Sequence, residues 1–238
     1  MSAQIKERPI LMSAPMVKAI LEGRKTMTRR IKSQPTNKVI TQVKGSLWAS
    51  EDIDVELITC PYGQVGDRLW CKETFVLEDD SEYQYENYNP LLTDRPIKTM
   101  PSEDEFSSSH LIPHYRATEP DVLITDGENG KGELKTVWSP SIFMPRWASR
   151  IILEITALRA ERVQKITEED AIQEGLGNQE PIAQFSCLWD KLYAKRGYSW
   201  ASNPWVWVIS FTIRERRGKW RVKSCGNGAD SASKRLVN

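Results

Sequence analysis

Residues 21–30 read LEGRKTMTRR, and this stretch marks a corner between a helix and a strand. Upstream, Ser13 offers a capping hydroxyl, Pro15 is a first-turn proline, and apolar residues recur with helical spacing over 16–21. Gly23 is placed to end this helix. The residues that follow are too polar for a core and too regular for a linker. The stretch therefore predicts a helix that begins near Ser13, ends at Gly23 and turns into a short strand.

Further elements are predicted outward from this corner. Alternation of apolar residues predicts strands over 68–77 and 151–162. Residues 167–174 resemble a capped short helix, and 185–193 fit an amphipathic helix. The apolar run over 205–213 is typical of a strand that is buried on both faces. Together these segments predict an α+β domain.

Two parts of the chain have a different character. Residues 78–137 show no sustained period and contain many prolines and glycines, so we expect an insertion or long loops that partly cover a pocket. Residues 214–238 hold eight basic and two acidic residues. This pattern predicts a flexible basic tail, with weak contact to nucleic-acid phosphates as the alternative. Residues 1–213 are then one domain.

Composition narrows the class of protein. A net charge of +1 argues against a protein that coats nucleic acid by charge alone. The four cysteines lack CxxC spacing and no apolar run approaches the ~20 residues of a membrane span, so we expect reduced thiols in a cytoplasmic protein. Pro113 separates His110 from His114, the two histidines of the chain, and we expect neither a metal nor another cofactor.

The stretch 21–30 resembles the signature of ASCH domains, a PUA-like family with a Gly-x-Lys-Thr core and an arginine further on. Residues 66–69, 166–174 and 207–211 extend the resemblance in the same chain order. More narrowly, the chain resembles the small bacterial amidohydrolases that deacetylate N4-acetylcytidine, and 140–148 resembles longer ASCH proteins of phages and prophages. The resemblance implies a small PUA-like β-barrel with flanking helices. The chain departs from the small enzymes at Ile31, where they carry an acidic residue, and in its long middle insertion.

The resemblance also implies a catalytic set of Lys25, Thr28 and Glu174. Metal-free amide hydrolysis requires a nucleophile, a proton carrier and a group that holds the oxyanion. Thr28 offers a hydroxyl, Lys25 an amine, and Glu174 a carboxylate that could orient the nucleophile or carry the proton. Whether Thr28 attacks or positions a water stays open.

Two conditions apply to this set. Lys25 works as a base only if its pKa falls from about 10.4, and burial beside Arg24, Arg29 and Arg30 would lower it. Lys25 and Thr28 are three residues apart, so in a straight strand they point to opposite faces. Their convergence requires a turn or bulge between them.

A second group of residues is predicted to bind substrate. Glu73 interrupts an apolar strand face, so it either pairs with an arginine or has a functional role, and Trp70 is either core or a stacking surface. The predicted substrate-binding residues are Arg24, Thr26, Arg29, Arg30, Glu73 and Trp70.

The implied reaction is hydrolysis of the N4-acyl amide of acylated cytidine or deoxycytidine to the nucleoside and a carboxylate. A module that binds RNA or a modified base is the first alternative, because PUA-like barrels commonly bind them. An ASCH-type ribonuclease is the second. The Lys-Thr-Glu set favours the enzyme, and the basic tail favours the binding module.

Overall fold

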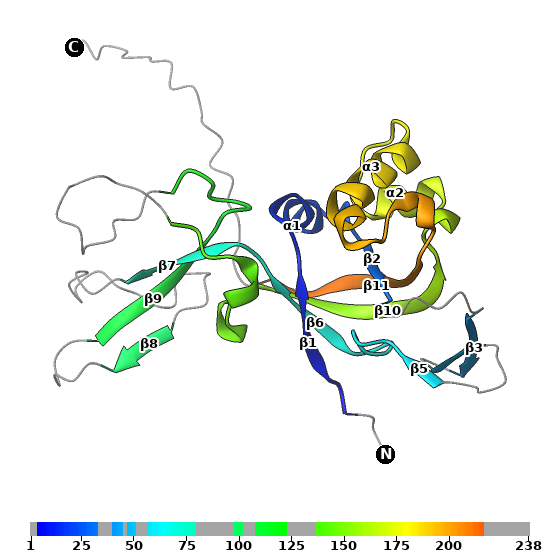
Figure 1. The fold of residues 1–238 in the computed structure, drawn as a ribbon. Coiled ribbons are helices and arrows are strands. Elements are labelled where there is room, and N and C mark those ends of the chain that lie inside the picture. The colour runs from blue at the N-terminus through cyan, green and yellow to red at the C-terminus, as the bar shows by residue number, and fades with distance from the viewer. Residues whose placement is uncertain are drawn as a thin grey trace, which may run out of the picture.

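The computed structural model describes residues 4–32, 40–44, 47–50, 57–79, 98–101, 108–122 and 137–216 as an α+β fold (Figure 1). The main sheet has the strand order β1-β6-β10-β11-β2, in which β1 and β6 are parallel and the other neighbours antiparallel. Its strands are β1 (Glu7–Leu11), β6 (Arg68–Lys72), β10 (Ile151–Arg162), β11 (Trp205–Arg216) and β2 (Met27–Ile31).

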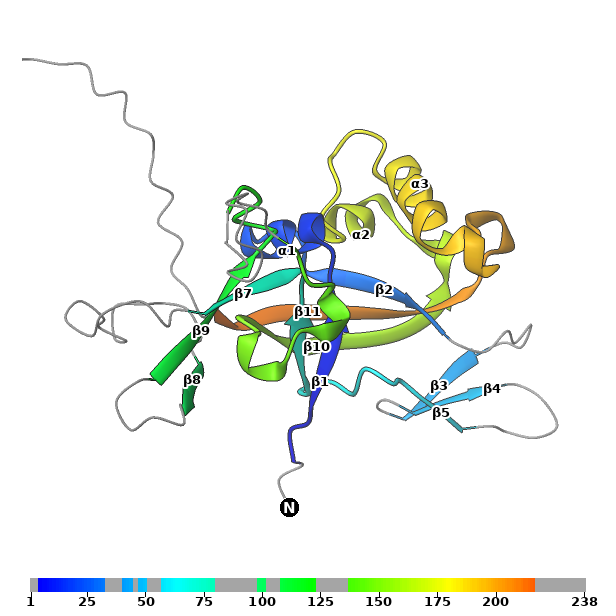
Figure 2. The same cartoon turned by 60° about the vertical axis from the view of Figure 1, so that its left-hand side comes forward.

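Three longer helices lie on one side of this sheet (Figure 2). They are α1 (Ala14–Leu21), α2 (Glu168–Gln173) and α3 (Pro181–Tyr193). Single turns of 3-10 helix are η1 (Ser141–Phe143), η2 (Arg146–Ala148), η3 (Val163–Lys165), η4 (Ala194–Arg196) and η5 (Trp200–Ser202). None of the helices in the described ranges is long and apolar enough to cross a bilayer.

Two small antiparallel sheets complete the described structure. One contains β3 (Ile40–Lys44), β4 (Leu47–Ser50) and β5 (Leu57–Thr59), in that order. The other has the order β7-β9-β8 and contains β7 (Phe75–Asp79), β9 (Ser108–Tyr115) and β8 (Lys98–Pro101). The two sheets lie at opposite ends of the main sheet in both views (Figures 1 and 2).

The main sheet is open, so the prediction of a closed barrel is wrong for the described strands. β1 and β2 are its two edges, and the chain passes from one to the other through α1. In place of a backbone ladder between these edges, the side chain of Arg30 donates from Nη2 to the carbonyl oxygen of Leu11 at 2.5 Å.

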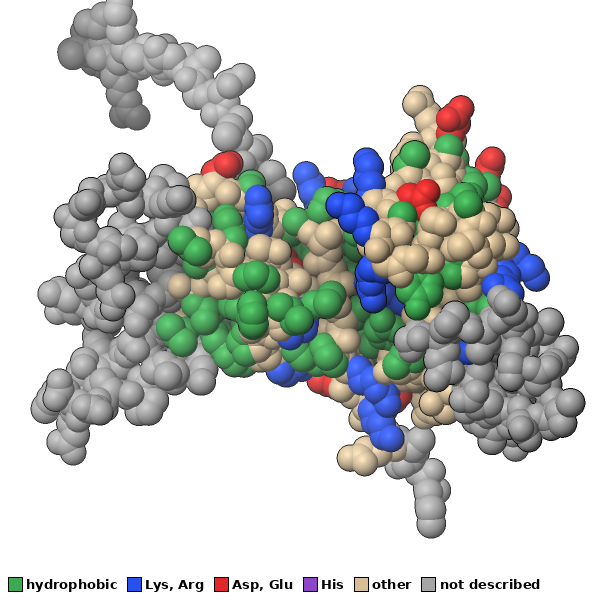
Figure 3. All heavy atoms as spheres, in the orientation of Figure 1, with side chains coloured by type: hydrophobic (Ala, Val, Ile, Leu, Met, Phe, Trp, Pro, Cys, Tyr) green, Lys and Arg blue, Asp and Glu red, His purple; other side chains and the backbone are tan. Residues whose placement is uncertain are grey.

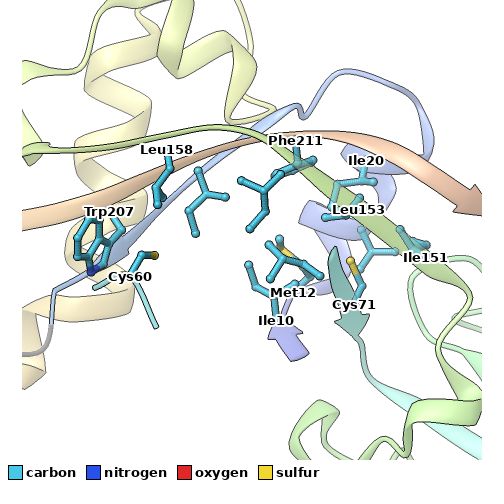
Figure 4. Close-up of a cluster of buried hydrophobic side chains, with 14 residues drawn as sticks. Ile10, Met12, Ile20, Cys60, Cys71, Ile151, Leu153, Leu158, Trp207 and Phe211 are labelled. Atoms are coloured by element: carbon cyan, nitrogen blue, oxygen red, sulfur yellow. The ribbon is translucent and has the colours of Figure 1, made fainter. Parts of the chain in front are cut away.

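A buried apolar cluster holds α1 against the sheet (Figure 4). The β10 and β11 strands pair over their full lengths with two register shifts. The cluster is non-directional and depends on removing apolar area from water. Its labelled members include Ile10, Met12, Ile20, Cys71, Leu153, Leu158, Trp207 and Phe211.

The predicted strand over 68–77 is wrong as a single element. The chain leaves the main sheet after Lys72, and β7 begins at Phe75 in a different sheet. Glu73 lies at this break, where its carboxylate is buried against Arg150. An apolar alternation cannot reveal the break, because both strands continue it.

Parts of the predicted insertion are ordered as strands. Strands β8 and β9 both fall within 78–137, and Tyr115 at the end of β9 packs on Phe75, Met144 and Ala148. Residues 80–97, 102–107 and 123–136 lie outside the described residues. The first three residues of the predicted tail belong to β11, and 217–238 lie outside the described residues.

Candidate active site

The corner after α1 contacts two segments that are far from it in the sequence. Gly23 has φ +76° and ends the helix as predicted, and the amide of Lys25 then donates to the Ala19 carbonyl at 3.0 Å. The amide of Thr26 donates to the Gln173 carbonyl at 2.9 Å, and the Thr26 carbonyl accepts from the amide of Phe211 at 2.8 Å. The stretches 21–30, 166–174 and 207–211 therefore meet at one place.

Gly175 allows this close meeting. Its φ of +94° lies in the left-handed region that favours glycine. A Cβ atom at this position would lie 2.9 Å from the Cβ of Ala19 and 3.1 Å from the Cβ of Lys25. Glycine is therefore required both by the backbone conformation and by the packing of the end of α2 against the corner.

Lys25 and Glu174 form a buried ion pair. The Nζ atom of Lys25 donates to Glu174 Oε2 at 2.6 Å, to the Glu174 carbonyl at 2.8 Å and to the Met27 carbonyl at 2.8 Å. The side chain of Lys25 has no exposed area and that of Glu174 is 5% exposed. An ammonium group has three N–H donors, so all three are used and none is directed at Thr28.

Burial lowers the pKa of Lys25 from its ordinary value, and Arg30 and Arg29 lower it further. The carboxylate of Glu174 acts in the opposite direction and raises it. The predicted direction of this pKa shift is therefore confirmed. The three acceptors around Nζ nevertheless suit the protonated ammonium, because a neutral amine would leave one of them without a donor.

Arg29 stands beside this pair in a closed ring of four side chains. Its Nη2 atom lies 2.8 Å from Glu161 Oε1 and 2.5 Å from Asp170 Oδ2. Arg159 pairs with the same two residues: its Nε atom lies 3.0 Å from Glu161 Oε2, and its Nη2 atom lies 2.5 Å from Asp170 Oδ2. Nη1 of Arg29 lies 3.5 Å from Oε1 of Glu174. The ring fixes the Arg29 guanidinium next to the carboxylate of Glu174.

The sequence interpretation did not assign Glu161, Asp170 or Arg159 to the site. Asp170 was noted only as part of the capping pattern, which the structure confirms, since Thr167 Oγ1 accepts from the Asp170 amide at 3.2 Å. Arg159 and Glu161 are two residues apart on β10 and so share a face. That cation–carboxylate alternation was the available signal.

A small hollow of about 20 Å³, which opens to solvent, lies over this cluster. Its polar lining comes from Thr28, Arg29, Arg30 and Glu174, and α1 and α3 provide an apolar wall. Oε1 of Glu174 is buried and accepts no hydrogen bond. The apolar wall consists of Met16, Phe185, Leu188, Trp189, Leu192 and Tyr193.

The three residues predicted to be catalytic thus lie at different depths. Thr28 and Glu174 line the hollow, whereas Lys25 lies behind Glu174 and does not. Strand β2 begins at Met27, so Lys25 belongs to the turn before the strand and its side chain is directed toward the end of α2. The expected convergence of Lys25 with Thr28 is not seen, because all three donors of Lys25 Nζ are directed at Glu174 and the Met27 carbonyl.

Four of the predicted substrate-binding residues lie elsewhere. Arg24 is exposed, pairs with Glu22 and donates to the Gly175 carbonyl at 2.9 Å. Thr26 is exposed and its backbone joins α2 to β11. Trp70 on β6 packs beneath two cations, with Lys72 Nζ 5.4 Å and the Arg146 guanidinium 5.8 Å from its ring centroid.

Glu73 is the fourth of these residues. Its two carboxylate oxygens each accept from Arg150 at 2.8 Å, and both residues are buried. Burial raises the pKa of Glu73 and Arg150 lowers it, with a net increase. The ring of Tyr115 lies 3.9 Å from the Arg150 guanidinium. The alternative of a buried ion pair is therefore confirmed for Glu73.

No described group of three or more His, Cys, Asp or Glu side chains is arranged to hold a metal ion. His114 is joined to Glu119, with Nδ1 2.6 Å from Oε2. Cys60, Cys71 and Cys187 are free thiols, and Cys225 lies outside the described residues. Comparisons of this chain with protein-family models, curated proteins and solved structures give no match.

Proposed function

We propose that the chain is a cytoplasmic, metal-independent amidohydrolase of the PUA-like ASCH type that removes the N4-acyl group of acylated cytidine or deoxycytidine. One observation carries the proposal. Oε2 of Glu174 is held by Lys25 at 2.6 Å, whereas Oε1 accepts no hydrogen bond and lies 3.5 Å from Nη1 of Arg29, and Glu174 and Thr28 both line the hollow. A carboxylate oxygen that accepts no hydrogen bond, in a residue that lines a hollow, is suited to take up and return a proton.

In the proposed reaction, a nucleophile adds to the acyl carbonyl carbon and transfers its proton to Oε1 of Glu174. The carbon–nitrogen bond then breaks, and Glu174 returns the proton to N4 as it leaves. A water nucleophile gives cytidine and a carboxylic acid directly. A Thr28 nucleophile gives an acyl ester first, which water cleaves in a second addition. Both routes use the same proton carrier.

Lys25 acts on this chemistry through Glu174. Two of its three donors hold the side-chain and the main-chain oxygen of Glu174 and the third holds the Met27 carbonyl, which fixes the carboxylate relative to the hollow. Fixed polar groups need little reorganisation during reaction. We therefore assign Lys25 as a positioning cation rather than as the base that the sequence interpretation favoured.

The meeting of the resembling segments supports the ASCH assignment. Residues 21–30 supply Lys25 and Thr28, residues 166–174 supply Glu174, and residues 207–211 hold the backbone of Thr26 in place. Residues 66–69 lie at a turn elsewhere, where Asp67 accepts from the amides of Lys6 and Gln64.

A binding module is the second candidate, and one observation favours it. All three donors of Lys25 are occupied, so Lys25 can act as a fixed positive charge in a binding site as well as beside a proton-transfer group. Incubation with N4-acetylcytidine, with ultraviolet detection of cytidine, separates the two candidates. Release of cytidine by the native chain and its loss in Glu174→Gln support the enzyme. Saturable binding without turnover supports the module.

A further inference from the structure

Arg30 carries a positive charge that no described carboxylate neutralises. Its Nη2 atom donates to the Leu11 carbonyl at 2.5 Å and lies 3.4 Å from the sulfur of Met12. Its Nε atom is buried without a hydrogen-bond partner. Arg29, the neighbouring residue, contacts three carboxylates. Of the two arginines that line the hollow, only Arg30 is therefore available to an anion.

The charge count around the hollow points the same way. The positive groups are Lys25, Arg29, Arg30 and Arg159, whereas the carboxylates that contact them are Glu161, Asp170 and Glu174. One positive charge remains in a partly desolvated setting, where an anionic ligand offsets it better than water does.

A second cation, Arg196, lies beside a residue that lines the hollow. Arg196 of η4 is exposed, and its guanidinium lies 6.0 Å from the ring centroid of Tyr193, which lines the hollow. Within the described ranges, Arg196 has no carboxylate partner. Arg30 lines the same hollow as Tyr193, so the two arginines are linked through this one tyrosine. Figure 3 shows Lys and Arg side chains gathered beside α1 and α3 on this face.

We propose that Arg30 and Arg196 form a subsite for one phosphate group beside the hollow, so that the preferred ligand is a cytidine nucleotide rather than the free nucleoside. Guanidinium groups bind phosphate through paired, charge-assisted hydrogen bonds. The identity of the base rests on the proposed function, whereas the preference for phosphate rests on the two arginines alone.

Calorimetric titration of the full chain with cytidine, cytidine 5′-monophosphate and a cytidine trinucleotide tests this subsite. We expect the monophosphate to bind roughly 10-fold more tightly than cytidine, as one charge-assisted contact provides. Arg30→Gln and Arg196→Gln should each remove most of this difference. Arg116→Gln is the matched control, because Arg116 is exposed at the end of β9, and it should retain the difference.

Three results would overturn the subsite. They are equal dissociation constants for cytidine and its monophosphate, an equal loss in Arg116→Gln, or trinucleotide binding more than about 10-fold tighter than the monophosphate. The last would assign the cations to an RNA chain. A phosphate preference without hydrolysis of N4-acetylcytidine or its monophosphate would refute the proposed reaction and leave the subsite standing. Hydrolysis of N4-acetylcytidine without a preference for the monophosphate would support the proposed reaction and refute the subsite.

Discussion

Nζ of Lys25 donates to both the carboxylate and the main-chain carbonyl of Glu174, at 2.6 Å and 2.8 Å. The two residues are 149 positions apart and also face each other as an antiparallel bridge. One side chain therefore sets both the position of the α2 terminus and the orientation of its last carboxylate. Stability and activity should respond together when this contact is displaced.

The substitution Gly175→Ala should displace the contact between Lys25 and Glu174. The new Cβ would meet Ala19 at 2.9 Å and Lys25 at 3.1 Å at a residue with φ +94°. We expect a loss of about 2–4 kcal/mol in the free energy of unfolding, from left-handed strain and overpacking together. Turnover of N4-acetylcytidine should also fall. Urea unfolding followed by circular dichroism measures the first effect.

Gly197→Ala is the control for the strain alone. Gly197 has φ +84°, but a Cβ there meets nothing within 4 Å. Gly197→Ala should lower the free energy of unfolding by only about 1–2 kcal/mol and leave turnover unchanged. Equal losses of stability in the two variants would show that the contact with Lys25 is not tight.

The ion pair of Glu73 and Arg150 gives a prediction about stability. Glu73→Gln should destabilise the fold by about 3–5 kcal/mol, because it removes the carboxylate charge that the buried Arg150 guanidinium faces. Glu73→Met combined with Arg150→Met should cost less than Glu73→Gln, since no charge then remains buried. Thermal denaturation of the variants measures both effects. A direct role of Glu73 in substrate binding would appear instead as a raised KM with unchanged stability.

Asp67 makes part of the stability dependent on acid pH. Burial raises its pKa, but the amides of Lys6 and Gln64 and the side chain of Arg8 outweigh burial and hold the pKa below 3.8. A carboxyl whose folded pKa is depressed stabilises the fold above its unfolded pKa, and loses this effect as pH falls through the folded value. The free energy of unfolding of the native chain should therefore exceed that of Asp67→Asn by about 1–3 kcal/mol near pH 6. This difference should shrink below pH ~4, as the Asp67 carboxylate becomes protonated. A gap that is constant from pH 6 to pH 2.5 would contradict this assignment.

The local parts of the site could be predicted from the sequence. Pro15 and Gly23 lie at the two ends of α1 as expected, and the Thr167 side chain caps α2. Ser13 is the N-cap residue of α1, but its hydroxyl makes no capping hydrogen bond, so that part of the prediction is wrong. The turn at Gly23 then places the residues from Lys25 onward. These elements depend on short-range chemistry, which a sequence displays directly.

The partners across the fold could not be predicted in this way. Arg29 lies 132 positions from Glu161 and 141 from Asp170, so no spacing rule connects them. Closure of a barrel depends on whether the edge strands pair, and in the structure the side chain of Arg30 contacts the Leu11 carbonyl between these edges. The break at Glu73 likewise depends on Arg150, which is 77 positions away.

Turnover of N4-acetylcytidine should not require a metal ion. The proposed steps use only Glu174, Thr28, Lys25 and water, so activity should persist in excess chelator. The assay compares initial rates before and after dialysis against the chelator. A loss of activity that zinc or magnesium restores would refute the proton-transfer role of Glu174.

Lys25→Arg tests whether Lys25 acts by geometry as well as by charge. A guanidinium keeps the charge but cannot place three donors on the same three acceptors from that buried position. We expect kcat to fall by roughly 10-fold or more, because small misplacements of a reacting group are costly. Near-native kcat would show that charge alone suffices and would favour the binding module.

The most direct measurement is kcat for N4-acetylcytidine in Glu174→Gln, beside Thr28→Ala and the control Glu169→Gln. Glu169 is an exposed carboxylate on α2, so its variant changes the same charge on the same helix without touching the hollow. We predict a fall of roughly 10²-fold or more for Glu174→Gln, because the amide cannot carry the proton, and native activity for Glu169→Gln. The Thr28→Ala variant decides the nucleophile: a comparable fall assigns Thr28, and near-native kcat assigns water. Near-native kcat in folded Glu174→Gln would contradict the account.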